Sequence, residues 1–353
     1  MNGRTTISRR AMLKAGAGSL VGTPAILQSA AASAEGKILY VNSYGGVWES
    51  SWRKAFFDPF TAASGITIKT VPGVSFAKLK AEVQTGNYQY DQSNLGDSEY
   101  AQASQEGLLE RLDKGAANAA QLPPSLVREF GIVSYSLGTN IVYRKDKFRN
   151  GGPQNWADFW NVKKFPGPRC LFDRSFTCLA FALLADGVPR DKLYPMDIDR
   201  AFRKMDEIKP HIKVWWHDGA QSQQLIRDAE VDMIAMWSAR AVDLIKDNVP
   251  LELVWDGAEL YWANLVVPKG DPSAKAAWQF AGFVAQAKPQ ADFATLLPYG
   301  PANPGARALM VESKLKLTPA WPANEAVMFQ HDTKWLAPRL AEIRERWTQW
   351  MTG

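Results

Sequence analysis

Two residues three positions apart, Trp237 and Arg240, are the strongest candidates for binding a charged ligand. They follow a strand predicted over residues 231–237 and stand at the start of the next predicted helix. A guanidinium in this place can bind a carboxylate through two parallel hydrogen bonds. The alternative is a surface ion pair between Arg240 and Asp243 or Asp247. The pattern therefore predicts either a carboxylate-binding arginine or a solvated helix face.

Two further segments place polar groups directly after predicted strands. Residues 219–222 open a helix, so their free N–H groups and the helix dipole favour an anion. Arg174 and Thr177 lie in a strand–helix loop, where Arg174 either faces a ligand or pairs with Asp173. Ligands of doubly wound sheets lie beyond the carboxyl ends of the strands, which makes these loops a candidate binding wall. The same rule adds the side chains of Tyr44, Trp48, Asp97, Ser98, Gln221 and Ser222.

Aromatic residues are abundant, with 14 tryptophans and 10 tyrosines in 353 residues. Such rings give a large apolar contact at low rotamer cost, and each face attracts a cation by about 0.5–2 kcal/mol. Most of the tryptophans are nevertheless expected in the core. The expected core members are Trp52, Trp156, Trp160, Trp255, Trp278, Trp347 and Trp350.

The composition argues against several classes of protein. Three histidines and two cysteines are too few for a His-rich metal centre or a disulfide-built scaffold, and we expect Cys170 and Cys178 to be buried free thiols. Four of the 41 basic residues and none of the 36 acidic ones precede Glu35, so the remainder is nearly neutral and lacks the basic stripe of a nucleic-acid-binding protein. His217 and Asp218 have no nucleophile or oxyanion loop beside them. We therefore expect no cofactor, no bound metal, no nucleic-acid partner and no catalysis.

The elements that position these groups alternate between strand and helix. Strands are predicted at 38–42, 66–71 and 91–95, and helices at 48–60, 76–85 and 98–106. The pattern restarts with a strand at 139–144 and continues to one at 261–267, and a helix predicted over 335–350 closes the chain. Such alternation predicts an α/β fold with parallel sheets covered on both faces. The length suits two lobes better than one core.

The first 34 residues predict an export signal. Arg9 and Arg10 lie in a segment, 8–14, that resembles the twin-arginine signal of bacteria, and a weakly apolar stretch over 15–27 follows. Ala32-Ser33-Ala34 is typical of a cleavage site. We expect the mature protein to begin near Glu35 and to reside in the periplasm.

Short segments distributed over nearly the whole mature chain have a recognisable order and spacing. They include Phe57-Asp58-Pro59-Phe60, Trp156-Ala157-Asp158-Phe159-Trp160, Gly219-Ala220-Gln221-Ser222, Trp237-Ser238-Ala239-Arg240 and Tyr299-Gly300-Pro301-Ala302-Asn303. In this order they resemble the bacterial extracellular solute-binding proteins of ATP-binding-cassette (ABC) importers. Within that family the resemblance is to the spermidine/putrescine-binding, or polyamine-type, group.

The resemblance implies an α/β, two-lobed periplasmic-binding-protein (Venus flytrap) fold of type II, with each lobe a sheet flanked by helices. Lobe 1 would hold residues 37–138 and 264–315, and lobe 2 would hold 139–263 and 316–353. The lobes would close over one small solute without reacting with it, and the closed form would dock on an inner-membrane ABC permease. We expect the protein to act as a monomer.

The resemblance also extends the candidate wall to Tyr261, Tyr299 and Gln330. Polyamine-binding relatives would hold ammonium groups with acidic residues in the loop 173–177 and at the second lobe crossing. Here the loop carries Arg174 and Thr177, and the crossing carries Ala263. Burying a diammonium beside an arginine without a paired carboxylate costs several kcal/mol.

We therefore expect a carboxylate-bearing solute, amino-acid-like or aromatic, that Arg240 binds between Trp237, Tyr261 and Tyr299. Two alternatives remain open at this point. One is a polyamine-binding transport protein, and the other is an exported enzyme that uses the same cleft.

Overall fold

The computed structural model describes residues 37–353, so the predicted export signal lies outside the described residues. Residues 37–353 belong to one compact unit. Over residues 37–353, no helix combines the length and the apolar character that crossing a membrane requires.

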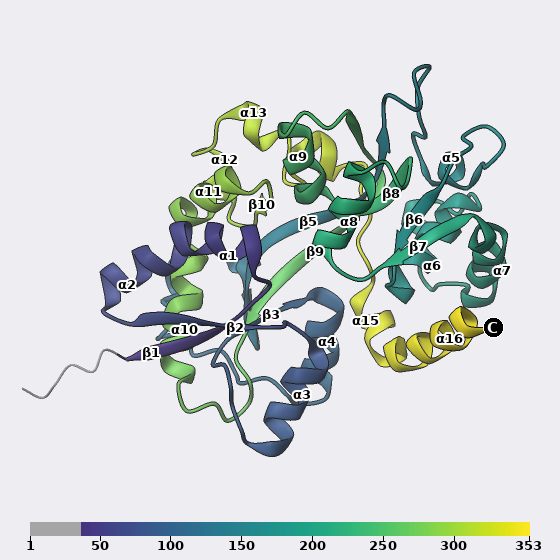
Figure 1. Cartoon of the computed structure of the whole chain (residues 1–353). Helices are drawn as coiled ribbons and strands as arrows, with labels where there is room; N and C mark the ends of the chain where they lie inside the picture. The colour runs from purple at the N-terminus through teal and green to yellow at the C-terminus, as the bar shows by residue number, and fades with distance from the viewer. Residues whose placement is uncertain (1–36) are drawn as a thin grey trace, which may run out of the picture. The chain divides into compact units, whose positions relative to one another are not determined.

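Two long antiparallel strands, β5 (Gly131–Arg144) and β9 (Leu251–Val266), run side by side through this unit (Figure 1). They lie inside one sheet with the strand order β3-β9-β5-β8-β6-β7, and the short strands β4 (Val127–Arg128) and β10 (Gly300–Pro301) also pair with β5. Their register shifts in two places, between Val133 and Tyr135 and between Thr139 and Ile141. At the second break, Thr139 pairs with Glu259 but Ile141 pairs with Val254. Residues 255–258 therefore bulge out of the ladder, which increases the local bend of the strand.

Helices cover the strands on one side of this break. Strand β1 (Ile38–Ser43) pairs in parallel with β2 (Thr67–Pro72), and β3 (Ser93–Gly96) pairs with β9. The helix that carries the aromatic spacing consists of α1 (Gly46–Trp52), a π-helical turn over Arg53–Phe57 and α2 (Asp58–Ser64). The other helices here are α3 (Phe76–Thr85), α4 (Asp97–Gln105), α10 (Ala274–Val284), α11 (Ala287–Leu296), α12 (Pro304–Arg307) and α13 (Glu312–Leu315).

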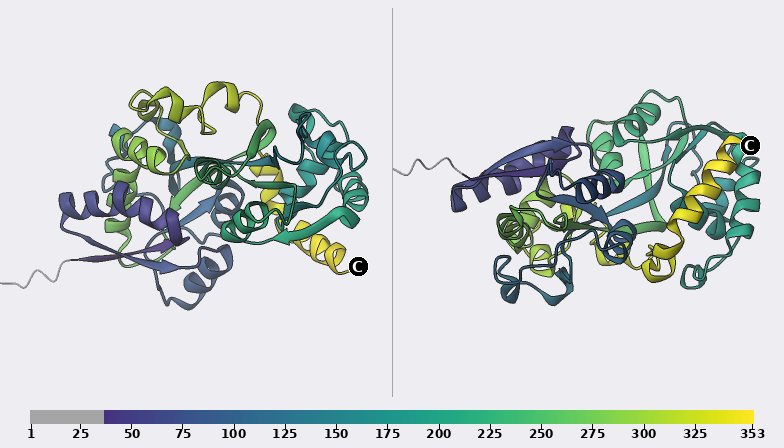
Figure 2. Two further views of the ribbon diagram at one scale, coloured as in Figure 1. Left: turned by 45° about the horizontal axis from the view of Figure 1, so that its top comes forward. Right: turned by 90° about the horizontal axis from the view of Figure 1, so that it is seen from below.

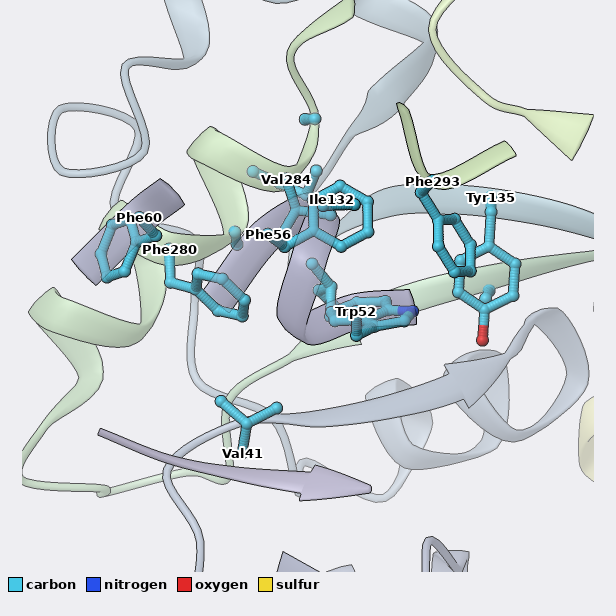
Figure 3. Close-up of a cluster of buried hydrophobic side chains, with 14 of the residues drawn as sticks. Val41, Trp52, Phe56, Phe60, Ile132, Tyr135, Phe280, Val284 and Phe293 are labelled. Atoms are coloured by element: carbon cyan, nitrogen blue, oxygen red, sulfur yellow. The ribbon is translucent and has the colours of Figure 1, made fainter. Parts of the chain in front are cut away.

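The aromatic spacing of the first helix has a structural purpose. Trp52, Phe56 and Phe60 bury their rings against Phe280 and Phe293, with ring centroids 4.7 Å apart between Trp52 and Phe56 and 5.3 Å apart between Phe56 and Phe293 (Figure 3). Aromatic pairs at such distances stabilise a core beyond their buried area. These rings hold the first helix onto α10 and α11.

On the other side of the break, β6 (Arg169–Phe172) pairs in parallel with β7 (Ile212–Trp216) and β8 (Met233–Trp237). The C-terminal helix α16 (Leu340–Thr352) packs against α6 (Ser175–Ala185), as two further views show (Figure 2). The remaining helices of this part are α5 (Trp156–Trp160), α7 (Ile198–Ile208), α8 (Gly219–Arg227), α9 (Ser238–Lys246), α14 (Pro322–Glu325) and α15 (Thr333–Leu336).

The buried side chains form separate clusters on the two sides. The main cluster of one side draws mostly on residues 39–137 and 263–302, and that of the other draws on 141–254 and 329–347. Cys170 and Cys178 are buried and free, as expected. The exact lobe boundaries stay a prediction.

The structure differs from the sequence prediction in three respects. The sheets are mixed rather than purely parallel, because β5 and β9 run antiparallel to their neighbours. Both strands are longer than the predicted 139–144 and 261–267, since buried polar residues such as Ser134, Ser136 and Glu259 interrupt their apolar pattern. The predicted closing helix is divided into α15 and α16 by a 3-10 turn at Ala337–Arg339.

Candidate ligand-binding cleft

A cavity of about 890 Å³ opens at the ends of several strands, where the sequence pattern placed the ligand. Its wall takes side chains from both predicted lobes, with Tyr44 and Glu99 on one side and Arg174 and Arg240 on the other. Tyr261, on β9, contributes from between them. Five predicted site residues line this cavity: Tyr44, Arg174, Trp237, Arg240 and Tyr261.

Arg240 lies near the start of α9 and packs against the first residue of α8. A Cβ at Gly219 would fall 2.9 Å from Arg240 Nε and 3.1 Å from a ring carbon of Trp237, so only glycine admits both side chains here. Arg240 Nη1 donates to Gln223 Oε1 at 3.3 Å, and its buried Nε has no partner among the described residues. Its guanidinium therefore keeps donors for a ligand.

The surface ion pairs that the sequence allowed for Arg240 do not form. Asp243 accepts instead from Gln223 Nε2 at 3.3 Å, and Asp247 lies 3.6 Å from Arg227. The two candidate carboxylates are thus engaged elsewhere.

Arg174 reaches across the cleft to Glu99 on α4. Its Nη2 lies 3.1 and 3.3 Å from the two carboxylate oxygens, and its Cζ lies 4.5 Å from the ring centroid of Phe176 and 5.1 Å from that of Tyr261. Burial works against the charge, but the carboxylates of Glu99 and Glu259 outweigh it and raise the pKa of the guanidinium. Arg174 is therefore a permanent cation fixed between two rings.

Glu259, which sequence reasoning missed, is fully buried near Arg174. Its carboxylate accepts from Thr139 at 2.6 Å and Thr177 at 2.9 Å, and it lies 2.8 Å from His331 Nε2. Burial alone would raise the pKa of Glu259, but the His331 hydrogen bond and the Arg174 charge hold it at about 2. The carboxylate is consequently ionised and joins β9 to β5, α6 and the segment before α15.

The expected anion site at the start of α8 is already occupied by the protein itself. Asp218 Oδ1 accepts from the N–H groups of Ala220 and Gln221 at 2.9 Å each, as an N-cap residue does. The prediction of an anion at these amides is therefore wrong.

Eight predicted site residues lie outside the cavity wall. Trp48 and Tyr299 are in the core, where Trp48 stacks on Trp52 at 4.4 Å and Tyr299 stacks on Tyr135 at 4.8 Å. Their rings thus pack in the interior rather than against a solute. Of the other six, Ser98, Thr177 and Ser222 are buried. Asp97 pairs with Arg128, Gln221 accepts from the His217 N–H, and Gln330 lines a separate cavity.

Several residues of the wall were not predicted. Glu99 lies in the first turn of α4, directly after the predicted Asp97 and Ser98. Arg344 and Trp347 reach the cavity from α16, although Trp347 was expected only in the core. A C-terminal helix gives no sign in the sequence that it returns to the mouth of a cleft. The remaining unpredicted lining side chains include Asn94, Phe76, Phe172, Asp173 and Phe176.

Comparisons with known proteins agree on one family. The family model for bacterial extracellular solute-binding protein matches residues 55–328. The gamma-aminobutyric acid-binding protein of Pseudomonas aeruginosa is 35% identical over 334 residues, which cover 91% of this chain and 93% of that protein.

Solved structures have the same fold. The binding protein AgtB of A. tumefaciens R10, in complex with agropinic acid, is 31% identical with a TM-score of 0.83, over 90% of this chain and 99% of that one. The spermidine/putrescine-binding PotD of Streptococcus pneumoniae is 18% identical with a TM-score of 0.70, over 89% and 99%, and shows the fold alone. The two-lobed fold is thus confirmed, whereas the polyamine-type grouping within the family is not.

Proposed function

We propose that this chain, which belongs to the family of bacterial extracellular solute-binding proteins, binds a small carboxylate-bearing solute through Arg240. It is the substrate-binding protein of an ABC importer, captures a small organic solute and works with a membrane permease. The identity of the solute and the residues that bind it are our proposal.

One observation supports the carboxylate: Arg240 is a cation in the cavity wall whose nearby carboxylates are engaged elsewhere. The packing against Gly219 and Trp237 and the hydrogen bond to Gln223 hold the guanidinium in a fixed orientation. A fixed guanidinium can bind a carboxylate through two parallel hydrogen bonds at little entropic cost. Trp237 supplies apolar surface beside it, and Tyr261 supplies more elsewhere in the wall.

The wall also suits capture by lobe closure. A ligand shifts the equilibrium between open and closed forms only if it binds the closed form better, so it must contact both lobes. In the proposed division into lobes 37–138 plus 264–315 and 139–263 plus 316–353, Tyr44 belongs to the first and Arg240 to the second. A solute between these two side chains would contact both.

The relatives suggest which compounds to test first. A protein named for binding gamma-aminobutyric acid makes that compound and related amino acids the first carboxylates to try. Putrescine and spermidine test the polyamine alternative. The wall does not favour it, because its carboxylates already accept from protein donors. Recovery of the bound solute unchanged would argue against an exported enzyme.

Titration calorimetry on residues 35–353 with this panel, with aromatic acids added, tests the proposal. We expect micromolar or tighter binding of a carboxylate, reduced at least about 100-fold in Arg240→Ala, because a charge-assisted bidentate pair is lost. Arg227→Ala is the matched control, since Arg227 is on α8 and pairs with Asp247 outside the cavity. Tight binding of putrescine or spermidine that Arg240→Ala leaves unchanged would contradict the carboxylate assignment.

Export through the twin-arginine pathway is a second, separate proposal, and it rests on residues 8–34 of the sequence alone. Replacing Arg9 and Arg10 together by lysine should keep the protein in the cytoplasm. Cell fractionation measures this directly, and an unchanged periplasmic pool would contradict it.

A further inference from the structure

The carboxylates in the cavity wall already have donors from the protein. Glu99 accepts from Arg174, Asp173 accepts from the Trp347 indole at 2.7 Å, and Asp218 caps α8. A positively charged group of a solute would have to share these carboxylates with the donors that they already bind, which weakens what it gains.

Two of the three arginines in the wall, Arg174 and Arg240, keep N–H groups that no protein acceptor uses. Among residues 37–353, the hydrogen bonds of Arg174 all start from Nη2, which leaves Nε and Nη1 without a protein acceptor. Arg240 uses Nη1 for Gln223, and its Nε has no partner within the described chain. An arginine carries five N–H donors, so both side chains keep donors for a solute.

We propose that Arg174 is a second solute-binding residue, and that it binds a neutral oxygen acceptor, such as a hydroxyl or carboxamide oxygen, at the end of the solute remote from the carboxylate. This inference rests on the proposed function, in which Arg240 binds the carboxylate. It names a class of solute: short carboxylic acids with an uncharged, oxygen-bearing far end. An ammonium in this place would meet the N–H donors of Arg174, and the nearby Glu99 carboxylate already binds that guanidinium.

The surroundings of Arg174 explain why the acceptor is neutral. Glu99 contacts the guanidinium directly, and the ionised Glu259 lies buried near it, so two negative charges already offset the one positive charge. A second carboxylate would face these two acids, whereas a neutral oxygen needs only the free N–H groups. The rings of Phe176 and Tyr261 keep the guanidinium in place, so little entropy is lost on binding.

A matched ligand series tests the inference. The four-carbon compounds butanoate, 4-hydroxybutanoate, succinamate, succinate and 4-aminobutanoate share one carboxylate and differ only at the far end, and their five-carbon counterparts form a second series. We expect the hydroxyl and carboxamide compounds to bind about 10- to 100-fold more tightly than the methyl compound, the range for a hydrogen bond to a charged donor. The ammonium and second carboxylate should give no gain over methyl.

Two variants assign this selectivity to Arg174. Arg174→Gln should bring all five affinities within about threefold of the methyl compound, and Arg174→Lys, which keeps the charge but loses the planar fork, should reduce the gain at least about fivefold. Arg307→Gln is the matched control, because Arg307 pairs with Glu325 at 3.3 Å outside the cavity. Thermal unfolding of each variant verifies that it is folded.

The outcomes separate the two proposals. If the compounds bind and depend on Arg240, but 4-aminobutanoate binds most tightly or Arg174→Gln leaves the ranking unchanged, the inference about Arg174 is wrong and the proposed function stands. If no compound of either series shows binding that depends on Arg240, the carboxylate-binding function itself is contradicted, and the inference with it.

Discussion

The ring of Tyr261 lies over Gly96, so close that a Cβ on the glycine would fall 2.0 Å from ring carbon Cε2. The same Cβ position lies 2.7 Å from Glu99 Oε2. Gly96 ends β3 and pairs with Ala263 across the antiparallel ladder to β9. The missing side chain at position 96 therefore allows an aromatic ring from β9 and a carboxylate from α4 to share one part of the cavity wall.

Gly96→Ala should consequently lower solute affinity at least about tenfold. The added methyl group forces the Tyr261 ring and the Glu99 carboxylate away from Arg174, and such overpacking also destabilises a fold by about 1–3 kcal/mol. Titration calorimetry and thermal unfolding measure the two effects. Gly115→Ala is the control, since a Cβ there meets only Asp113 Oδ1, at 3.3 Å. Equal affinities in the wild type and Gly96→Ala would show that the wall adjusts freely.

The part of the fold that could be read from the sequence is the part with local signals. The predicted range of α3 and the predicted start of α8 agree with the structure, because Gly86 ends α3 and Asp218 begins α8 as helix caps do. The length of β9 was missed because Asp256 and Gly257 resemble a loop. In the structure they belong to the bulge opposite the break in β5.

In the candidate site, too, the residues with a local sequence signal could be predicted and the others could not. Arg240 could be predicted because a local pattern, an arginine after a strand, places it. Glu259 could not, since its partners Thr139, Thr177 and His331 are 72 to 120 positions away in the sequence. Tyr299 was placed in the cleft by resemblance alone, and its position depends on Tyr135, a packing partner that local sequence does not reveal.

Glu259 should make stability depend on pH in the acidic range. Its pKa of about 2 in the fold lies below the ordinary 4.5, so its stabilisation is complete above about pH 4.5 and is lost as the pH falls toward 2. The shift corresponds to roughly 3 kcal/mol. We expect Glu259→Gln to be less stable than the wild type by about this amount at pH 7, and the difference to shrink by pH 3. Urea unfolding at both pH values measures it, and a constant difference would show that Glu259 is not ionised.

Asp271 should have the opposite effect on stability, lowering it as the pH rises. Burial, with the charges of Asp91 and Glu82, raises its pKa to about 7, and its Oδ2 has no partner among the described residues. Because the folded pKa exceeds the ordinary 3.8, ionisation of Asp271 costs stability as the pH rises from about 4 to 7.

Asp271→Asn keeps the acceptor for the Ser273 N–H but removes the charge. We expect this variant to be more stable than the wild type by about 1–3 kcal/mol at pH 8, with a smaller difference at pH 5. Urea unfolding at the two pH values measures the difference. A variant that is less stable at pH 8 would contradict the raised pKa.

Asn94 combines two properties that rarely occur together. It is fully buried in the cavity wall, and neither its Nδ2 nor its Oδ1 has a partner within residues 37–353. It precedes Gly96 by two positions on β3, so both lie on the same face of the strand. An unpaired buried amide costs about 1–3 kcal/mol. A cost of this size is understandable if the amide is used when a solute is bound.

Asn94→Leu tests this directly, because leucine has nearly the same shape and no polar atoms. The ligand-free variant should be more stable than the wild type by about 1–3 kcal/mol, while its solute affinity should fall about tenfold as the amide is lost. Thermal unfolding without solute and calorimetry with it measure the two changes. A less stable variant would mean that the amide is paired in solution, and an unchanged affinity would remove Asn94 from the binding wall. A gain in stability combined with a loss of solute affinity is the result that only a binding role for this amide explains, since replacing a purely structural asparagine would not lower the affinity.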